Sequence, residues 1–372
     1  MEKIALAGPF ITKKEEDYVV DAVRNGWYAT YDKHIRLLEK TFAEYVGVKH
    51  AIATYCGTHA LHLATIALGL KPGDEVICVD QSYIATAMAI SYVGATPVFV
   101  DIDPETLCID PSKVEEAISP KTKAIMLVHF AGFAADMDSI MRIAKENDLA
   151  VIEDACQAVG VRYNGKHCGT FGDVGTFSFQ GAKICVGGEG GMFITNDDAL
   201  YERAYHYGTF CRNDNLDYLA SDGLGYNYRI SNITAALILA QVERIEELVE
   251  RKHQIFEWYK KHLVTVPFVS ILSPDDQNKC QSNYAYVVGY LDEDCPVERD
   301  TLIKFMINDN NIIMRPGYPS MSGQLGYERR YPVPYSDRYH KHGLVFPTAM
   351  NITEEDVERV CKTLIRGIGE IK

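Results

Sequence analysis

The 372-residue sequence contains no apolar run long enough to span a membrane and no cysteine pair spaced as CxxC. The first absence predicts that the chain has no transmembrane helix. The ten cysteines are scattered without a zinc-like cluster, which predicts reduced thiols and no metal site. The start, MEKIALAGPFITKKEE, lacks the hydrophobic core of a signal peptide, so we expect a cytoplasmic protein.

Positive charge is also scarce in this chain. Lys and Arg number 37 against 51 Asp and Glu, which gives a formal net charge of −14. This balance argues against a nucleic-acid partner, although a local basic patch can still bind a phosphorylated substrate. No internal repeat or low-complexity tract is present. The 47% hydrophobic content is enough to form one large core and a smaller second one.

Short apolar runs alternate with helical patterns through the first two thirds of the chain. The runs predict strands at 51–54, 75–79, 97–100, 124–128, 149–152, 176–179 and 192–195. Helical patterns lie between most of them, with caps such as Thr12 with Glu15 and Asp110 with Pro111. This alternation predicts an α/β fold with a mostly parallel sheet and helices on both faces.

The last third has a different pattern. We expect one long helix over 231–261, strands at 268–272, 284–291 and 312–314, a helix over 296–308 and a last helix starting at 351–356. These elements predict a small α+β domain over 246–372 that follows a large domain over 1–245. The segment 208–228 is too irregular for a core element, and loops of this length are usually functional or disordered.

The stretch 151–195 combines the residue types of a pyridoxal phosphate (PLP) site. Asp154 follows an apolar strand, and ligands of α/β sheets gather at the carboxyl ends of strands. A carboxylate there can keep a pyridine nitrogen protonated, which makes the ring an electron sink. Lys183 follows the next strand, where its amine can form a Schiff base and move protons. Each residue alone also suits a turn, cap or solvated loop, and their joint occurrence favours the site.

Two further positions fit the same cofactor. Gly57 and Thr58 lie between a strand and a helix, and the N-terminus of a helix binds phosphate through free N–H groups and its dipole. Tyr83 follows the strand 75–79, where its ring can lie on the pyridine ring, although a core tyrosine gives the same pattern.

The motifs EDACQA (153–158), FSFQGAK (177–183) and GEGG (188–191) resemble those of the DegT/DnrJ/EryC1/StrS sugar aminotransferases. The resemblance covers nearly the whole chain and implies the type I, aspartate aminotransferase-like PLP fold. It implies that Lys183 carries the cofactor, Asp154 contacts the pyridine nitrogen, Gln157 lies near the ring oxygen, Ser178 binds the phosphate and Tyr83 stacks on the ring. Dehydratases of this family have histidine in place of Lys183, so amino transfer is favoured.

The motif GYNYRISNI (225–233) also resembles this family. It implies that Asn227 reaches the PLP phosphate of a neighbouring subunit, so the active sites of a homodimer would be shared, and it makes Arg229 a candidate for substrate contact. Tyr28 and Thr30 lie in a segment that the family uses near its substrate. Here that segment lacks the usual serine pair, which leaves substrate identity open.

Three other residues are candidates for substrate contact because each follows a predicted strand. They are His129, Arg315 and Tyr318. A structural loop role for His129 and an ordinary surface position for Arg315 are the alternatives. The basic, aromatic run at 326–343 fits either a nucleotide-binding surface or a solvated connection.

The resemblance implies transfer of an amino group from L-glutamate to C4 of a nucleotide-linked 4-keto-6-deoxy sugar. GDP-4-keto-6-deoxymannose is the first choice of acceptor. A UDP- or dTDP-linked 4-keto or 3-keto sugar is the alternative. An oxidoreductase is disfavoured because no GxGxxG follows the first strand and Lys183 has no use in hydride transfer. A non-catalytic PLP-fold protein is disfavoured because Asp154, Ser178 and Lys183 are all present.

Overall fold

The computed structural model describes residues 2–371 except 214, 218, 275–278 and 325. Its α-helices are α1 (Lys13–Asn25), α2 (Lys33–Val46), α3 (Gly57–Ala67), α4 (Ala85–Tyr92), α5 (Pro111–Ala117), α6 (Met137–Glu146), α7 (Asp198–Gly208), α8 (Asn232–Val242), α9 (Ile245–Leu263), α10 (Arg299–Lys304), α11 (Pro334–His342) and α12 (Glu354–Glu370). Its strands are β1 (His50–Thr54), β2 (Glu75–Val79), β3 (Thr96–Val100), β4 (Thr122–Val128), β5 (Ala150–Asp154), β6 (Arg162–Tyr163), β7 (Lys166–His167), β8 (Val174–Ser178), β9 (Gly191–Thr195), β10 (Val269–Ile271), β11 (Cys280–Gln281), β12 (Val288–Leu291), β13 (Arg315–Pro316) and β14 (Gly343–Val345). Shorter turns of helix are η1 (Tyr28–Thr30), η2 (Phe130–Gly132), η3 (Phe305–Asp309, a π-helix) and η4 (Met321–Gly323).

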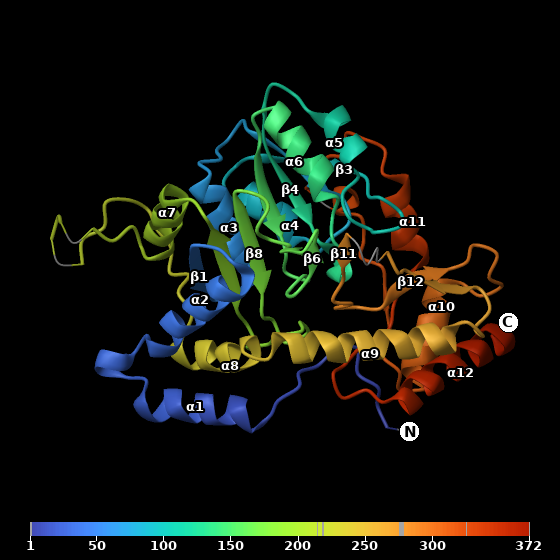
Figure 1. Cartoon of the computed structure of the whole chain (residues 1–372). Helices are drawn as coiled ribbons and strands as arrows, with labels where there is room; N and C mark the ends of the chain where they lie inside the picture. Colours follow the sequence, from blue (N-terminus) through green and yellow to red (C-terminus); the bar gives the residue numbers. More distant parts are fainter. Residues whose placement is uncertain (1, 214, 218, 275–278, 325, 372) are drawn as a thin grey trace.

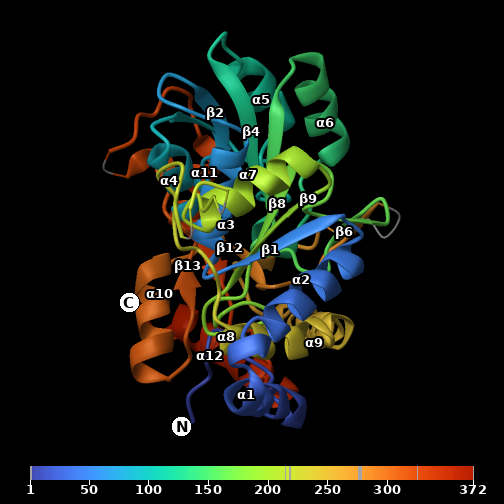
Figure 2. The ribbon, with the colours of Figure 1, turned by 90° about the vertical axis from the view of Figure 1, so that its left-hand side faces the viewer.

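The large sheet has seven strands in the order β1-β9-β8-β5-β4-β2-β3. Only β9 runs antiparallel to its neighbours β1 and β8. Side chains alternate across the sheet, so in β2 Val76 and Cys78 join one buried cluster while Ile77 and Val79 join the other. Helices therefore cover both faces, as Figures 1 and 2 show. The predicted mostly parallel α/β sheet is confirmed.

The carboxyl edge of this sheet gathers the predicted cofactor residues. β5 ends at Asp154 and β8 ends at Ser178. β1 leads directly to α3, which begins at Gly57, and β2 leads to Tyr83 just before α4. Because neighbouring parallel strands end at the same edge, residues far apart in the sequence meet there.

The C-terminal part forms a second sheet of four antiparallel strands, in the order β10-β12-β14-β13. α8 and α9 run beneath the large sheet, and α9 leads to this second sheet and to α12 (Figure 1). The long helix expected over 231–261 is wrong as a single element, because the chain breaks between α8 and α9. At the break Arg244 leaves helical geometry and its guanidinium binds buried Glu15 on α1, at 2.6 Å. We propose this break as the boundary between the two domains.

Three smaller expectations for this part are also corrected. The strand expected at 284–291 is limited to β12, because Tyr284 has a left-handed φ of 46° and stacks on Phe256. The strand expected at 312–314 begins only at Arg315, since Ile312 bridges the N-terminal segment instead. The helix expected over 296–308 is α10, which continues as the π-helix η3.

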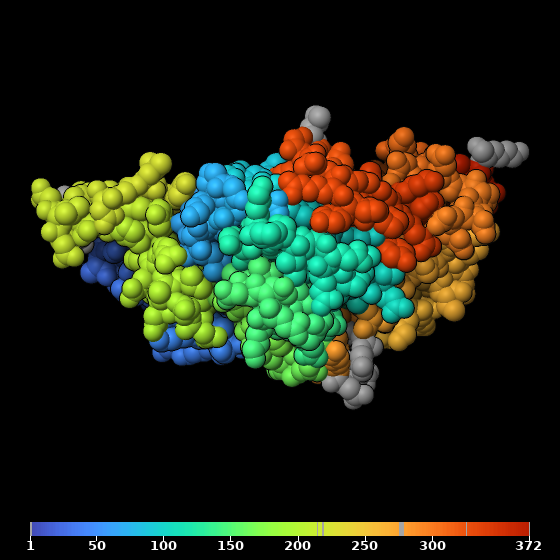
Figure 3. Space-filling view, turned by 90° about the horizontal axis from the view of Figure 1, so that it is seen from above, coloured from blue at the N-terminus to red at the C-terminus, as the bar shows by residue number. Residues whose placement is uncertain are grey.

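The segment between α7 and α8 stands out from the body of the protein. Isolated bridges join Thr209 to Asn227 and Arg212 to Ser221, so its two halves run back along each other. Figure 3 shows this yellow-green segment at one end of the molecule. Residues 214 and 218 within it lie outside the described residues. None of the helices that the structure describes has the length and apolar content needed to cross a membrane.

Candidate active site

Asp154 is held rigidly at the end of β5. Its side chain is 4% exposed, Thr86 Oγ1 donates to Oδ2 at 2.8 Å, and the Cys156 N–H donates to Oδ1 at 3.1 Å. Both donors are uncharged, and none of the described residues forms an ion pair with this carboxylate, which can accept a further hydrogen bond from a group in the site. Sequence reasoning missed Thr86, whose signal is its position one helical turn after Tyr83.

Lys183 lies in a tight turn after β8. Its N–H donates to the Gln180 carbonyl at 2.8 Å, and the Gly181 N–H donates to the Gly188 carbonyl at 3.0 Å. The turn needs glycine because Gly188 and Gly190 have φ values of 81° and 155°, which other residues rarely adopt. The predicted glycine cluster therefore shapes the backbone that presents the lysine.

The amine of Lys183 faces a group of polar and aromatic side chains. Its Nζ lies 6.0 Å from the centre of the Tyr286 ring, and the Tyr286 hydroxyl donates to the Ala182 carbonyl at 3.3 Å. Burial alone would lower the pKa of Lys183, but Tyr286, Tyr318 and the neighbouring acidic groups raise it above its ordinary value. Asp154 is one of those groups, which places the two key residues in one electrostatic environment. Nothing in the sequence predicted that Tyr286 would lie next to Lys183.

The start of α3 lies against Ser178. A Cβ atom at Gly57 would lie 3.0 Å from both Ser178 Cβ and Cys156 Sγ, so a larger residue would push these two side chains away. No side chain caps the N-terminus of α3, where Thr58 follows Gly57. The helix N-terminus and the Ser178 hydroxyl together suit a phosphate group.

Substitution of Gly57 by alanine tests this approach. Overpacking costs about 1–3 kcal/mol, so we expect affinity for PLP to fall by about tenfold or more. The dissociation constant of PLP measures the effect. Gly369→Ala is the matched control, because Gly369 has no atom within 4 Å of a Cβ and lies in α12, where alanine favours the helix. Unchanged PLP affinity in Gly57→Ala would contradict the predicted cradle.

Gln157 and Tyr83 occupy two sides of the same edge. Gln157 is 5% exposed, and its Oε1 accepts the Ala131 N–H at 2.8 Å, which fixes the side-chain amide. Tyr83 is 61% exposed, and it lies close enough to Tyr318 to add to the effect of burial, which raises the pKa of Tyr318 above its ordinary value. The exposed Tyr83 ring is thus free to stack on a ligand, and the roles of both residues stay predictions.

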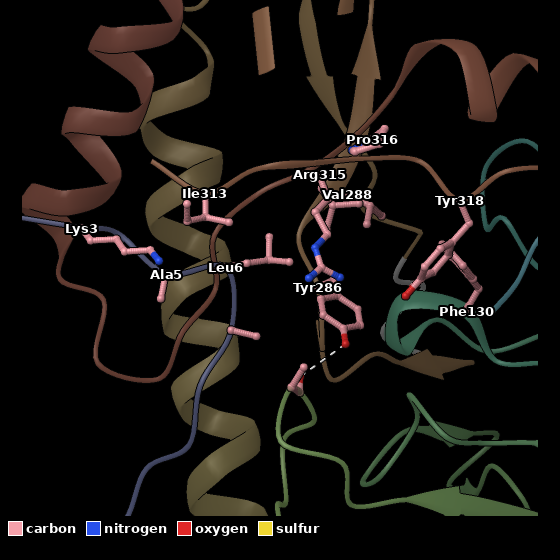
Figure 4. A pocket seen from close by; sticks show the side chains of 13 residues that line it. Lys3, Ala5, Leu6, Phe130, Tyr286, Val288, Ile313, Arg315, Pro316 and Tyr318 are labelled. Carbon is pink, nitrogen blue, oxygen red and sulfur yellow. Dashed lines mark hydrogen bonds between the residues drawn. The ribbon is translucent and has the colours of Figure 1, made fainter. Parts of the chain in front are cut away.

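A cavity of about 230 Å³ lies next to the turn that carries Lys183. Figure 4 shows the side chains that line it. Its walls include Ala182 next to Lys183, together with Tyr286, Arg315 and Tyr318. The Tyr318 carbonyl accepts from Gln81 Nε2 at 3.1 Å, which ties this C-terminal loop to the large domain. Two of the predicted substrate residues, Arg315 and Tyr318, therefore line the cavity that the turn of Lys183 borders through Ala182.

The structure corrects the prediction for His129. Its side chain is fully buried, Nδ1 accepts the Ala135 N–H at 3.2 Å, and Nε2 lies 2.9 Å from Glu153 Oε2. Both ring nitrogens are occupied inside the protein, so the structural loop role holds and the residue is closed to a substrate. The sequence signal for this structural role was Glu153, the acidic residue before Asp154. Glu153 also accepts hydrogen bonds from the backbone N–H groups of Gly169, Phe171 and Gly172.

Four other candidates lie away from the cavity beside Lys183. Tyr28 is 96% exposed, and the Thr30 hydroxyl donates to backbone carbonyls of its own turn. Arg229 Nε donates to Asn227 Oδ1 at 3.3 Å, and both residues are exposed. None of the four lines the cavity beside Lys183. A single chain therefore does not bring all the predicted site residues together.

A lysine after β8, a buried carboxylate after β5 and an uncapped helix N-terminus beside a serine fit PLP at the carboxyl edge of this sheet. The fold and the site define a PLP-dependent aminotransferase. The model of the DegT/DnrJ/EryC1/StrS aminotransferase family matches residues 9–365, and the chain belongs to this family.

Individual relatives agree with this class. The chain is 40% identical over 372 residues to the GDP-perosamine synthase of Caulobacter vibrioides, with 98% of each chain covered. The crystal structure of the aminotransferase TlmJ from Streptoalloteichus hindustanus has a TM-score of 0.92 at 28% identity and covers 98% of this chain and 99% of its own. The structure of DesI in the presence of its TDP-sugar product has a TM-score of 0.91 at 28% identity, and the match covers 100% of this chain and 94% of the DesI chain.

Proposed function

We propose that this protein transfers an amino group from L-glutamate to C4 of GDP-4-keto-6-deoxymannose, which gives GDP-perosamine. The observation that carries the proposal is the 40% identity over 98% of both chains to a GDP-perosamine synthase. The cavity beside Lys183 is compatible with this acceptor. Leu6, Val288 and Ile313 give it an apolar wall suited to the methyl group of a 6-deoxy sugar.

Bound PLP supplies a ring that stabilises negative charge at the substrate carbon. Asp154 would hold the ring nitrogen protonated, and Thr86 and the Cys156 N–H keep the carboxylate in position. Lys183 would hold the cofactor covalently between turnovers. When the incoming amine displaces it, its own amine would carry the proton between the substrate carbon and the cofactor. Ser178, Gly57 and Thr58 would bind the phosphate, while Tyr83 and Gln157 would fix the ring.

The same residues would serve both halves of the reaction. In the first half Lys183 would move the proton of bound L-glutamate, which would leave as 2-oxoglutarate. In the second half Lys183 would move the proton in the opposite direction while the keto sugar is aminated. Both substrates would meet the amine of Lys183, so the cavity next to it would have to accept a dicarboxylate and part of a much larger sugar nucleotide in turn.

The exposed positions of Asn227, Arg229, Tyr28 and Thr30 support a homodimer with shared sites. The segment that ends at Asn227 stands out from the protein, as a segment that reaches a second subunit would (Figure 3). Leu224 within this segment is 86% exposed, and Tyr31, which lines one hollow together with Phe210 and Arg229, is 61% exposed. We infer that Asn227 of the partner subunit completes the phosphate site of each chain.

A comparison of acceptors tests the substrate. Enzyme converted to its amino form with L-glutamate is mixed with GDP-4-keto-6-deoxymannose or with UDP- and dTDP-linked 4-keto-6-deoxy sugars. We expect the GDP sugar to react at least about tenfold faster in terms of kcat/KM, because a site that binds a base through hydrogen bonds rejects one lacking them. Product analysis by NMR then gives the aminated carbon. A preference for the dTDP or UDP sugar would replace the proposed acceptor with the alternative, for which DesI with its TDP-sugar product is the precedent.

A further inference from the structure

The N-terminal segment forms part of the wall of the cavity beside Lys183. Ile4 is buried and bridges Ile312 in parallel, through Ile4 N–H to Asn311 O at 2.9 Å and Ile313 N–H to Ile4 O at 3.0 Å. This pairing fixes the backbone on both sides of Ile4. Lys3 precedes it, and its side chain lines the cavity.

Lys3 and Arg315 are the two cationic residues of this wall. Figure 4 shows the Arg315 guanidinium next to Tyr286, and Lys3 farther from Tyr286, on the other side of Leu6. Arg315 thus lies on the side of the cavity close to Lys183, whose Nζ faces the Tyr286 ring. The two cations therefore lie at different distances from Tyr286, along a wall that includes the apolar Leu6 and Ile313. We call the Arg315 end the inner position and the Lys3 end the outer position.

Neither cation has an acidic partner within salt-bridge distance among the described residues, although the chain carries a net charge of −14. The basic run at 326–343 differs in this respect, because Arg329 pairs with Asp337 and Arg330 pairs with Glu75. The two interpretations of that run from the sequence, a nucleotide-binding surface or a solvated connection, stay predictions.

We propose that Lys3 and Arg315 bind the diphosphate of the sugar nucleotide, and that Lys3 acts on the acceptor alone. The proposal rests on the proposed function, which supplies a diphosphate-linked acceptor. Arg315, at the inner position, has the planar fork that suits a carboxylate or a phosphate, so it serves L-glutamate as well as the acceptor. Lys3 lies at the outer position, and its ammonium group is a point charge on a flexible side chain. The smaller amino donor does not reach this position.

The test uses GDP as the probe and the PLP-loaded full-length enzyme. For Lys3→Gln we expect GDP to bind about tenfold more weakly, and its affinity to depend less on salt, because one charge-assisted contact is lost. UDP and dTDP should lose the same factor, since the contact is to the diphosphate and not to the base. The rate of the half-reaction with L-glutamate should stay within about twofold of wild type. Arg315→Gln should weaken both GDP binding and the glutamate half-reaction.

Lys145→Gln is the matched control, because Lys145 is an exposed lysine on α6 that forms no ion pair with any residue the structure describes and does not line the cavity. It makes the same change in net charge and should leave GDP affinity unchanged. The proposal is overturned if Lys3→Gln binds GDP as tightly as Lys145→Gln does. It is also overturned if Lys3→Gln slows the glutamate half-reaction by the same factor by which it weakens GDP binding. Failure of the proposed function gives a different result. The wild-type enzyme then does not react with L-glutamate, or it reacts faster with a sugar linked to another nucleotide. In the second case Lys3→Gln still weakens the binding of nucleoside diphosphates.

Discussion

Lys183→Ala is expected to abolish amino transfer. The variant loses both the covalent attachment of the cofactor and the amine that moves the proton, and proton transfer alone contributes about 10²–10⁴-fold. We therefore expect kcat/KM to fall by at least about 10³-fold. The side chain lies in a turn whose shape is set by Gly188 and Gly190, so its removal should leave the fold intact. Steady-state kinetics and the visible spectrum with added PLP measure the two losses.

Lys145→Ala provides the control for the loss of one lysine, because Lys145 is exposed on α6. It should retain wild-type kinetics and the absorption band of lysine-bound PLP. PLP should still bind to Lys183→Ala without the covalent bond, because Ser178 and the start of α3 are unchanged. Substantial amino transfer by Lys183→Ala, with correct folding shown by circular dichroism, would rule out Lys183 as the catalytic lysine.

Two inactive variants are expected to restore activity when they are mixed. Asn227→Asp places a carboxylate where the phosphate of the neighbouring subunit is proposed to bind, and repulsion should reduce activity by about 10²-fold. When it is mixed with Lys183→Ala and the subunits exchange, each heterodimer contains one site with both defects and one site with none. In an equal mixture about a quarter of all sites are then intact, so about a quarter of wild-type activity should return.

Asn215→Asp makes the same substitution in the same protruding segment and is the control. It should remain active alone, because Asn215 is not predicted to contact the cofactor. Recovery of activity in the mixture shows that Asn227 acts across the subunit interface. If the mixture stays as inactive as its components after subunit exchange is verified by mass spectrometry, Asn227 belongs to the site of its own chain.

The parts of the structure that sequence reasoning predicted well depend on local patterns. The strands of the large sheet follow from short apolar runs, and Asp154 and Ser178 end two of them. The capping box of Thr12 and Glu15 correctly predicted the start of α1. The segment 151–195 contains both Lys183 and Asp154. Their proximity could therefore be inferred once the strands of this segment were predicted to belong to a parallel sheet.

The parts that were missed depend on contacts between distant residues. Arg244 breaks the long helix because its partner is Glu15, 229 residues earlier in the chain. His129 is closed to substrate because the fold brings it to Glu153, and an isolated histidine after a strand gives no sign of that. Tyr286 and Lys3 reach the cavity only through the packing of the C-terminal sheet and the bridge between Ile4 and Ile312.

The most direct test is the visible spectrum of the purified protein with PLP, before and after addition of L-glutamate and then of GDP-4-keto-6-deoxymannose. Amino transfer through Lys183 predicts a band of lysine-bound cofactor that L-glutamate converts to the amino form and that the keto sugar restores. If the band does not form, or if L-glutamate leaves it unchanged, the proposed aminotransferase reaction with this donor is contradicted. If the band is lost but the keto sugar does not restore it, the reaction class stands and the acceptor is wrong.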